Sequence, residues 1–178
     1  MHRRTAAFAC CFTIGLPGTG LAQPAVLVAP NVVPIHDTLV TSGQPNAASL
    51  AQLGAAGFQA VIYLAPAGVS DAVPDERQIV ERQGLSWLHI PIDFEHPRDA
   101  DFDTFVRTMK ELAPRKVLVH CQVNMRASSL VFLHRVLIDK VSPDVAYEAV
   151  SRVWSPRGPW KLLIESQLRR HGVAFELY

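Results

Sequence analysis

The residue with the clearest capacity for chemistry is Cys121, which follows a nearly all-apolar run at residues 116–120 (KVLVH). Such a run is typical of a central parallel strand covered on both faces. A short loop follows, and the apolar residues 127–138 predict a buried helix. Ligands of open α/β sheets bind where strands end, and the N–H groups of a helix N-terminus favour anions. The same field stabilises a thiolate, so Cys121 is a candidate nucleophile.

The residues after Cys121 are suited to binding an oxyanion. Arg126 carries a planar, permanently charged guanidinium that can contact two oxygen atoms at once. Asn124 lies mid-loop, where its tolerance of a left-handed backbone would help a tight turn. Ser128 could donate a hydrogen bond to the cysteine sulfur. With the backbone amides of the loop, the predicted phosphate-binding residues are Gln122, Val123, Asn124, Met125, Arg126, Ala127 and Ser128.

The sequence HCQVNMRAS at residues 120–128 resembles the phosphate-binding loop of cysteine-dependent protein tyrosine and dual-specificity phosphatases. Three more segments resemble a bacterial subgroup of this superfamily, so that the likeness covers about residues 36–140; they are TSGQP (41–45), GFQAVIYL (57–64) and IPID (90–93). The resemblance implies hydrolysis of a phosphorylated protein or small phosphoester through a phosphocysteine intermediate. It implies no metal or other cofactor.

The loop departs from the usual phosphatase pattern, in which five residues separate the cysteine from the arginine. Here four residues separate Cys121 from Arg126, and Ser128 comes one residue later than usual. Two alignments with the phosphatase loop are possible. In the first, Ser128 occupies the position of the family's serine or threonine, Asn124 that of its glycine and Ala127 that of its arginine. In the second, Arg126 occupies the position of the family's arginine and the loop is one residue shorter. The spacing also resembles rhodanese-type sulfurtransferases. A sulfurtransferase and a non-catalytic anion-binding module are therefore alternative functions.

Asp93 is the predicted proton donor to the leaving group. It lies 28 residues before Cys121 and directly after a predicted strand at residues 85–92. In the resembling phosphatases an aspartate on a mobile loop has this role, because the acid must be protonated when the phosphoryl group leaves and ionised when water attacks. Rhodanese chemistry does not require this acid, so Asp93 favours the phosphatase. Its competitors in the same loop are Glu95, His96 and Asp99.

Two further residues are predicted to support the site. The resemblance implies that His120 orients the loop through hydrogen bonds. Gln44 could reach the site from the end of the first predicted strand. Trp154 and Trp160 are expected to pack the C-terminal region.

Strand and helix patterns alternate along the chain, which predicts an α/β fold with a mostly parallel sheet. The resemblance implies about four or five strands, flanked by helices and followed by C-terminal helices. The predicted strands are residues 38–41, 58–64, 85–92 and 116–120. The predicted helices are about 46–57, 75–83, 127–138, 143–154 and 159–171, together with one that begins near Asp101 and carries Phe102, Phe105, Val106 and Met109 on one face.

The N-terminus has the pattern of a secretory signal peptide over residues 1–22. Arg3 and Arg4 precede an uncharged apolar stretch, and Gly20 and Ala22 provide small residues for cleavage. Export to the periplasm or secretion is therefore expected. Residues 23–35, which contain three prolines, are expected to be an extended lead-in to a single phosphatase-like domain at residues 36–178.

The charge and hydrophobicity of the chain restrict the kinds of partner that are expected. The 178 residues have a formal net charge of +1, which argues against an extended nucleic-acid surface. A second apolar span is not found in the sequence, so stable membrane insertion is not expected. Cleavage after Ala22 would remove Cys10 and Cys11 and leave Cys121 as the only thiol. The resemblance, rather than the composition, implies a phosphorylated protein or a small phosphoester as the substrate.

Overall fold

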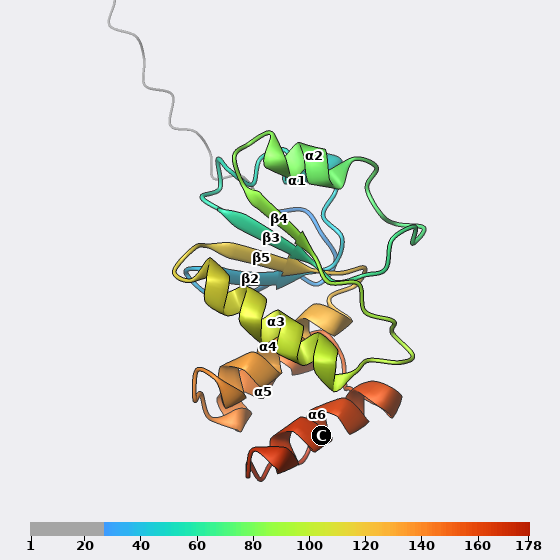
Figure 1. Ribbon diagram of the computed structural model, residues 1–178, viewed down its shortest axis with the longest axis vertical. Coiled ribbons are helices and arrows are strands. Elements are labelled where there is room, and N and C mark those ends of the chain that lie inside the picture. Colours follow the sequence, from blue (N-terminus) through green and yellow to red (C-terminus); the bar gives the residue numbers. More distant parts are fainter. Residues whose placement is uncertain (1–26) are drawn as a thin grey trace, which may run out of the picture.

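The computed structural model of this chain describes residues 27–178. Its core is a five-stranded sheet in the order β1-β2-β5-β3-β4 (Figure 1). β1 pairs antiparallel with β2, and all other pairs are parallel. The strands are β1 (Val33–His36), β2 (Leu39–Ser42), β3 (Ala60–Tyr63), β4 (Ser86–His89) and β5 (Val117–His120). The predicted mostly parallel α/β fold is confirmed.

Helices cover both faces of the sheet. α1 (Ala47–Leu50) and α2 (Glu76–Glu81) lie on one face (Figure 1). The other face carries α3 (Asp99–Leu112), α4 (Met125–Leu137), α5 (Pro143–Ser151) and α6 (Gly158–Arg170). Neighbouring residues of a strand point to opposite faces. Val61 and Leu118 therefore pack in a small core with α1 and α2, while Ile62 and Val119 belong to the larger core beneath the other helices.

β5 is the central strand, and all four of its residues are buried. Its neighbours β2 and β3 run parallel to it, so the segments that follow the three strands meet at one edge of the sheet. α4, which follows β5, is apolar and buried along most of its length. The loop between β5 and α4 is thereby fixed at the middle of the sheet's carboxyl edge.

Several element boundaries differ from the predictions. The helix expected over 46–57 is the single turn α1 followed by further turns, although Asn46 caps it as predicted by accepting from Ser49 N at 2.8 Å. Part of the expected lead-in is the edge strand β1, where Pro34 is tolerated because an edge strand leaves one side unpaired. α4 begins at Met125, two residues earlier than expected.

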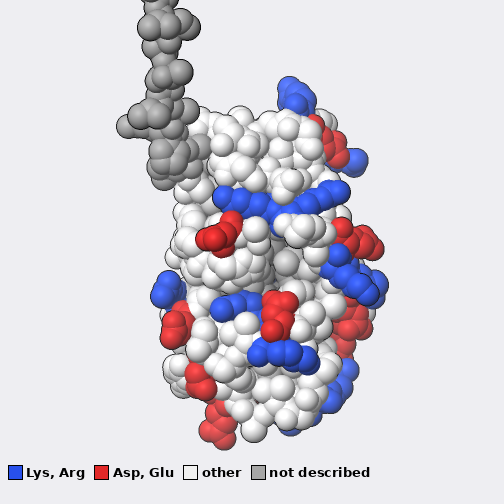
Figure 2. All heavy atoms as spheres, turned by 90° about the vertical axis from the view of Figure 1, so that its left-hand side faces the viewer, with Lys and Arg blue, Asp and Glu red and all other residues white. Residues whose placement is uncertain are grey.

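The predicted signal peptide, residues 1–22, lies outside the described residues. Within residues 27–178, no helix combines the length and apolar character needed to cross a membrane. Figure 2 shows the face at which the strands begin, opposite the β5–α4 loop, and acidic and basic side chains are interspersed there. Because both signs of charge are mixed there, the charge pattern does not identify this face as a binding surface for an anionic or a cationic ligand.

Candidate active site

The site is built around the loop that joins β5 to α4. Cys121 follows the last residue of β5, is fully buried, and donates from its backbone N to Ser42 O at 3.3 Å. Asn124 ends the loop in the left-handed region, with φ of 73°. The N–H groups of Met125, Arg126 and Ala127 lie in the first turn of α4 and have no acceptor within the helix. The loop therefore combines a buried thiol with the anion-binding end of a helix.

Contacts from distant segments hold the loop's carbonyl groups. Gln44 N donates to Gln122 O at 2.9 Å, and Asn31 Nδ2 donates to Val123 O at 3.0 Å. Both acceptors are engaged by residues outside the loop. This arrangement favours amide groups that face the loop's interior, as an anion-binding nest requires.

The turn at Asn124 is fixed by its own side chain and by a close approach of Gly43. Asn124 Nδ2 donates to Asn31 O at 2.6 Å and to Thr41 Oγ1 at 3.0 Å. A Cβ atom on Gly43 would lie only 2.6 Å from Gln122 O. The positive φ of Asn124 favours the register in which Asn124 takes the usual glycine place and Ala127 the usual arginine place.

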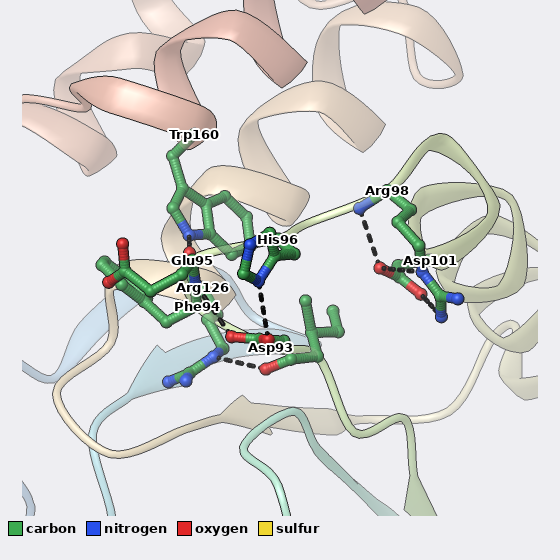
Figure 3. A network of polar contacts seen from close by, with 9 residues as sticks. Asp93, Phe94, Glu95, His96, Arg98, Asp101, Arg126 and Trp160 are labelled. Atoms are coloured by element: carbon green, nitrogen blue, oxygen red, sulfur yellow. Dashed lines mark hydrogen bonds and ion pairs between the residues drawn. The ribbon is translucent and has the colours of Figure 1, made fainter.

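Arg126 therefore lies one residue before the position that the arginine usually occupies in the phosphatase loop. Arg126 is 5% exposed, and its Nε donates to Ile92 O at 3.0 Å (Figure 3). Nη1 donates to Gln122 Oε1 at 3.4 Å, and the guanidinium carbon lies 5.1 Å from the centre of the Phe94 ring. Nη2 makes no hydrogen bond to any residue from 27 to 178. Arg126 thus joins the loop to the segment after β4 and keeps N–H donors for a ligand.

Asp93 lies on that segment, with its carboxylate directed to its own loop (Figure 3). Its Oδ2 is 2.9 Å from His96 Nδ1, and its Oδ1 accepts from Glu95 N at 2.9 Å. The hydrogen bond from His96, followed by that from Glu95 N, lowers the pKa of Asp93, and the charge of Arg126 adds to this effect. The side chain is 62% exposed. Proton donation therefore requires acidic solution or release from His96.

The competing acids differ in their contacts. Glu95 and His96 are exposed in the same loop. Asp99 begins α3 and is bound by Gln167 Nε2 at 2.8 Å and by Arg170. These contacts tie Asp99 to α6, so it is less free to act as a proton donor than Asp93.

A buried carboxylate that the sequence reasoning missed, Glu76, supports both predicted helper residues. It accepts from Gln44 Nε2 at 2.6 Å and Trp87 Nε1 at 2.9 Å, and it bonds His120 Nε2 at 2.9 Å. Burial raises the pKa of Glu76, but these three hydrogen bonds and the attraction to His120 outweigh burial and lower it. The available signal was Val80, one helical turn later, which puts Glu76 on the buried face of α2.

Two more residues reach the loop without having been predicted. Asp71, on the loop after β3, accepts from Gln122 Nε2 at 2.8 Å. Tyr63 ends β3 with its hydroxyl buried, and burial, followed by the negative charges of Glu76 and Asp71, raises its pKa to about 12. Tyr63 is therefore a neutral hydroxyl beside the site at physiological pH.

Ser128 does not make the contact expected of it. Its hydroxyl donates to Met125 O at 3.2 Å, and no hydrogen bond to the sulfur of Cys121 occurs within residues 27–178. A serine in the first turns of a helix readily bonds a carbonyl of the preceding turn. In the same part of the chain, no group of His, Cys, Asp or Glu side chains is arranged to hold a metal ion.

Comparison with known proteins shows a similar overall fold. No protein-family model matches the sequence. The crystal structure of a "Putative phosphatase (DUF442)" from Shewanella putrefaciens CN-32 superposes with a TM-score of 0.73 and 28% identity, covering 80% of this chain and 91% of that one. Tk-PTP in its active form superposes with a TM-score of 0.65 and 22% identity, covering 79% and 98%, which is a likeness of fold.

In its fold the chain is similar to phosphatases of the protein-tyrosine-phosphatase-like superfamily. The Shewanella DUF442 protein is one such structural neighbour. Among curated proteins, the beta-lactamase hydrolase-like protein of Xylella fastidiosa (strain Temecula1 / ATCC 700964) is 29% identical over 116 residues, which are 64% of this chain and 27% of that protein. The chain spans about a quarter of the length of the curated relatives it matches.

Proposed function

We propose that this protein is a phosphoric monoester hydrolase of the tyrosine or dual-specificity type, with Cys121 as its nucleophile. One observation carries the proposal: the buried thiol of Cys121 lies at the start of a loop that leads into the N-terminus of α4, where Arg126 is held by its hydrogen bond to Ile92 O. This arrangement stabilises a thiolate and binds the oxygens of a phosphoryl group. The phosphatase fold of its structural neighbours supports it.

The reaction has two steps. The Cys121 thiolate attacks phosphorus, the bond from phosphorus to the leaving oxygen breaks, and protonated Asp93 gives its proton to that oxygen. A phosphocysteine results. Ionised Asp93 then takes a proton from water, whose oxygen attacks phosphorus; the sulfur–phosphorus bond breaks, and thiolate and inorganic phosphate are released. Loop amides and Arg126 stabilise the equatorial oxygens in both steps.

The first test is hydrolysis of an aryl phosphate by the purified chain with and without vanadate. Cys121→Ser should abolish turnover, because an alcohol at this position is a far weaker nucleophile than a thiolate, and should still bind inorganic phosphate through the loop. Thermal shift with phosphate measures that binding. Turnover that survives Cys121→Ser would overturn the assignment.

The purified chain can also be used to test the two alternative functions, a sulfurtransferase and an anion-binding module. Only the spacing of Cys121 and Arg126 favours the sulfurtransferase. Incubation with thiosulfate followed by intact-mass measurement would reveal a stable persulfide on Cys121. Persulfide formation without phosphatase turnover would favour the sulfurtransferase. Phosphate binding without either reaction would favour an anion-binding module.

We also propose that the chain is exported, on the strength of the pattern at residues 1–22. N-terminal sequencing of the protein recovered from the periplasm or medium should begin at Gln23. Recovery in the cytoplasm with Met1 in place would contradict the proposal.

A further inference from the structure

The segment that carries Asp93 is held by an aromatic cluster from the C-terminal part of the chain. The Phe94 ring lies 5.8 Å from the rings of both Trp154 and Trp160, measured between centroids. Trp160 is fully buried at the start of α6, and its Nε1 donates to Phe94 O at 2.9 Å (Figure 3). The cluster therefore restrains both the side chain and the backbone of Phe94, the residue next to the predicted acid.

The Phe94 ring also contacts Arg126. The guanidinium carbon lies 5.1 Å from the Phe94 centroid, and Nε of Arg126 donates to the carbonyl of Ile92. An aromatic face favours a cation above it and fixes the plane of a guanidinium. Ile92 and Phe94 thus contact Arg126, while Trp160 of α6 contacts Phe94 (Figure 3).

We propose that Trp160 is a positioning residue for the site: through Phe94 it holds the Asp93 segment and the plane of Arg126 in their working arrangement. This inference rests on the proposed function for its effect on turnover, but the restraint itself belongs to the fold. The Trp160 N–H is the contact on which it depends. Burial of an indole N–H without a partner is costly, and this one is satisfied by a backbone carbonyl of the acid segment.

The chain offers a matched pair for the test. Trp160→Phe removes the hydrogen bond to Phe94 O and keeps an aromatic ring. Trp154→Phe removes an indole N–H that has no partner within residues 27–178 and also keeps a ring beside Phe94. Ile164→Val removes one buried methylene from α6 and leaves the aromatic rings and the Trp160 N–H in place, and so reports the effect of weaker helix packing.

Two measurements separate the inference from the proposed function. Hydrogen exchange of residues 92–98, followed by mass spectrometry, should be about 3- to 10-fold faster in Trp160→Phe, as expected for the loss of one hydrogen bond, and unchanged in the two controls. With an alkyl phosphate, whose poor leaving group needs the acid, kcat should fall by about the same factor in Trp160→Phe, with a smaller change in KM.

Each possible result either supports or overturns the positioning role of Trp160. Exchange that is unchanged in Trp160→Phe, or equally fast in Ile164→Val, overturns the positioning role whatever the activity. Faster exchange in Trp160→Phe with unchanged kcat also overturns it, because the restraint would then not serve the reaction. If the wild-type chain shows no turnover while exchange in residues 92–98 still depends on Trp160 alone, the proposed function fails and the restraint on the segment stands.

Discussion

At the scale of single residues, the acid and the base of the proposed reaction are the same carboxylate, and His96 has the largest effect on its protonation. Asp93 shares a hydrogen bond with His96, the largest cause of its lowered pKa. A lowered pKa suits the second step, in which Asp93 acts as a base, and limits the first, in which it must carry a proton. We therefore expect a pH optimum on the acidic side of neutrality.

His96→Ala tests this dependence. Loss of the His96 hydrogen bond should raise the pKa of Asp93, so the protonated form persists to higher pH and the basic limb of the kcat/KM profile moves upward. The pH–rate profile measures the shift. His36→Ala, a change of another histidine at the far end of the strands, should leave the profile in place. A basic limb that does not move in His96→Ala would remove Asp93 from the role of proton donor.

At the scale of elements, the loop takes its shape from the chain segments that surround it. Gly43, directly after β2, admits the Gln122 carbonyl because it has no side chain, and Asn31 reaches the loop from the segment before β1. Loops that join strands to helices carry function because a rigid framework positions them. Here the framework includes residues more than 75 positions away in sequence.

Gly43→Ala should displace the loop. The new Cβ would lie 2.6 Å from Gln122 O and 2.8 Å from Pro30 Cβ, closer than real contacts allow. We expect a loss of about 1–3 kcal/mol in the free energy of unfolding. We also expect a fall of about 10- to 100-fold in kcat/KM, because small misplacements of catalytic groups are costly.

Urea unfolding and aryl phosphate kinetics measure these two effects. Gly54→Ala is the matched control, because its Cβ would meet the flexible end of Leu85 at 3.3 Å. Equal kinetics for Gly43→Ala and Gly54→Ala would show that the close approach does not shape the loop.

At the scale of the whole molecule, Glu76 joins parts of the fold that are far apart in sequence. It belongs to α2 and binds side chains that follow or lie in β2, β4 and β5. An ionised carboxylate buried among three donors stabilises the fold only while it stays ionised. Because its folded pKa is lowered, its contribution is complete above the ordinary glutamate pKa and is lost as the pH falls through the folded value.

Glu76→Gln should lower the free energy of unfolding at pH 7 by about 2–4 kcal/mol, because an amide cannot satisfy all three donors. The difference from wild type should shrink as the pH falls below about 4.3, the ordinary glutamate value, because the unfolded wild-type chain then takes up a proton at Glu76 while the folded chain still keeps the carboxylate ionised. Urea unfolding at neutral and acidic pH measures this difference. Glu81→Gln, an exposed change on the same helix, should alter stability by less than about 0.5 kcal/mol. A pH-independent penalty for Glu76→Gln would contradict the argument.

The sequence alone predicts those features of the fold and the site that depend on residues close together in the chain. The apolar run before Cys121 and the alternation of elements predict the sheet and the place of the nucleophile, and both features depend on neighbours in the chain. The register of the loop is different, because the left-handed turn at Asn124 is stabilised by Thr41 and Asn31. The partners of Glu76 are likewise up to 44 residues away. Such pairings depend on how the strands assemble, so a single sequence does not reveal them.

The placement of the aromatic network gives the protein an optical property. The chain has three tryptophans, and each lies in the supports of the site: Trp87 bonds Glu76, while Trp154 and Trp160 pack against Phe94. Indole emission is sensitive to nearby charge and packing. Because no tryptophan lies elsewhere, the intrinsic fluorescence of the unlabelled protein reports on the surroundings of Arg126 and His120, and occupancy of the loop can be followed by titration without a chromogenic substrate.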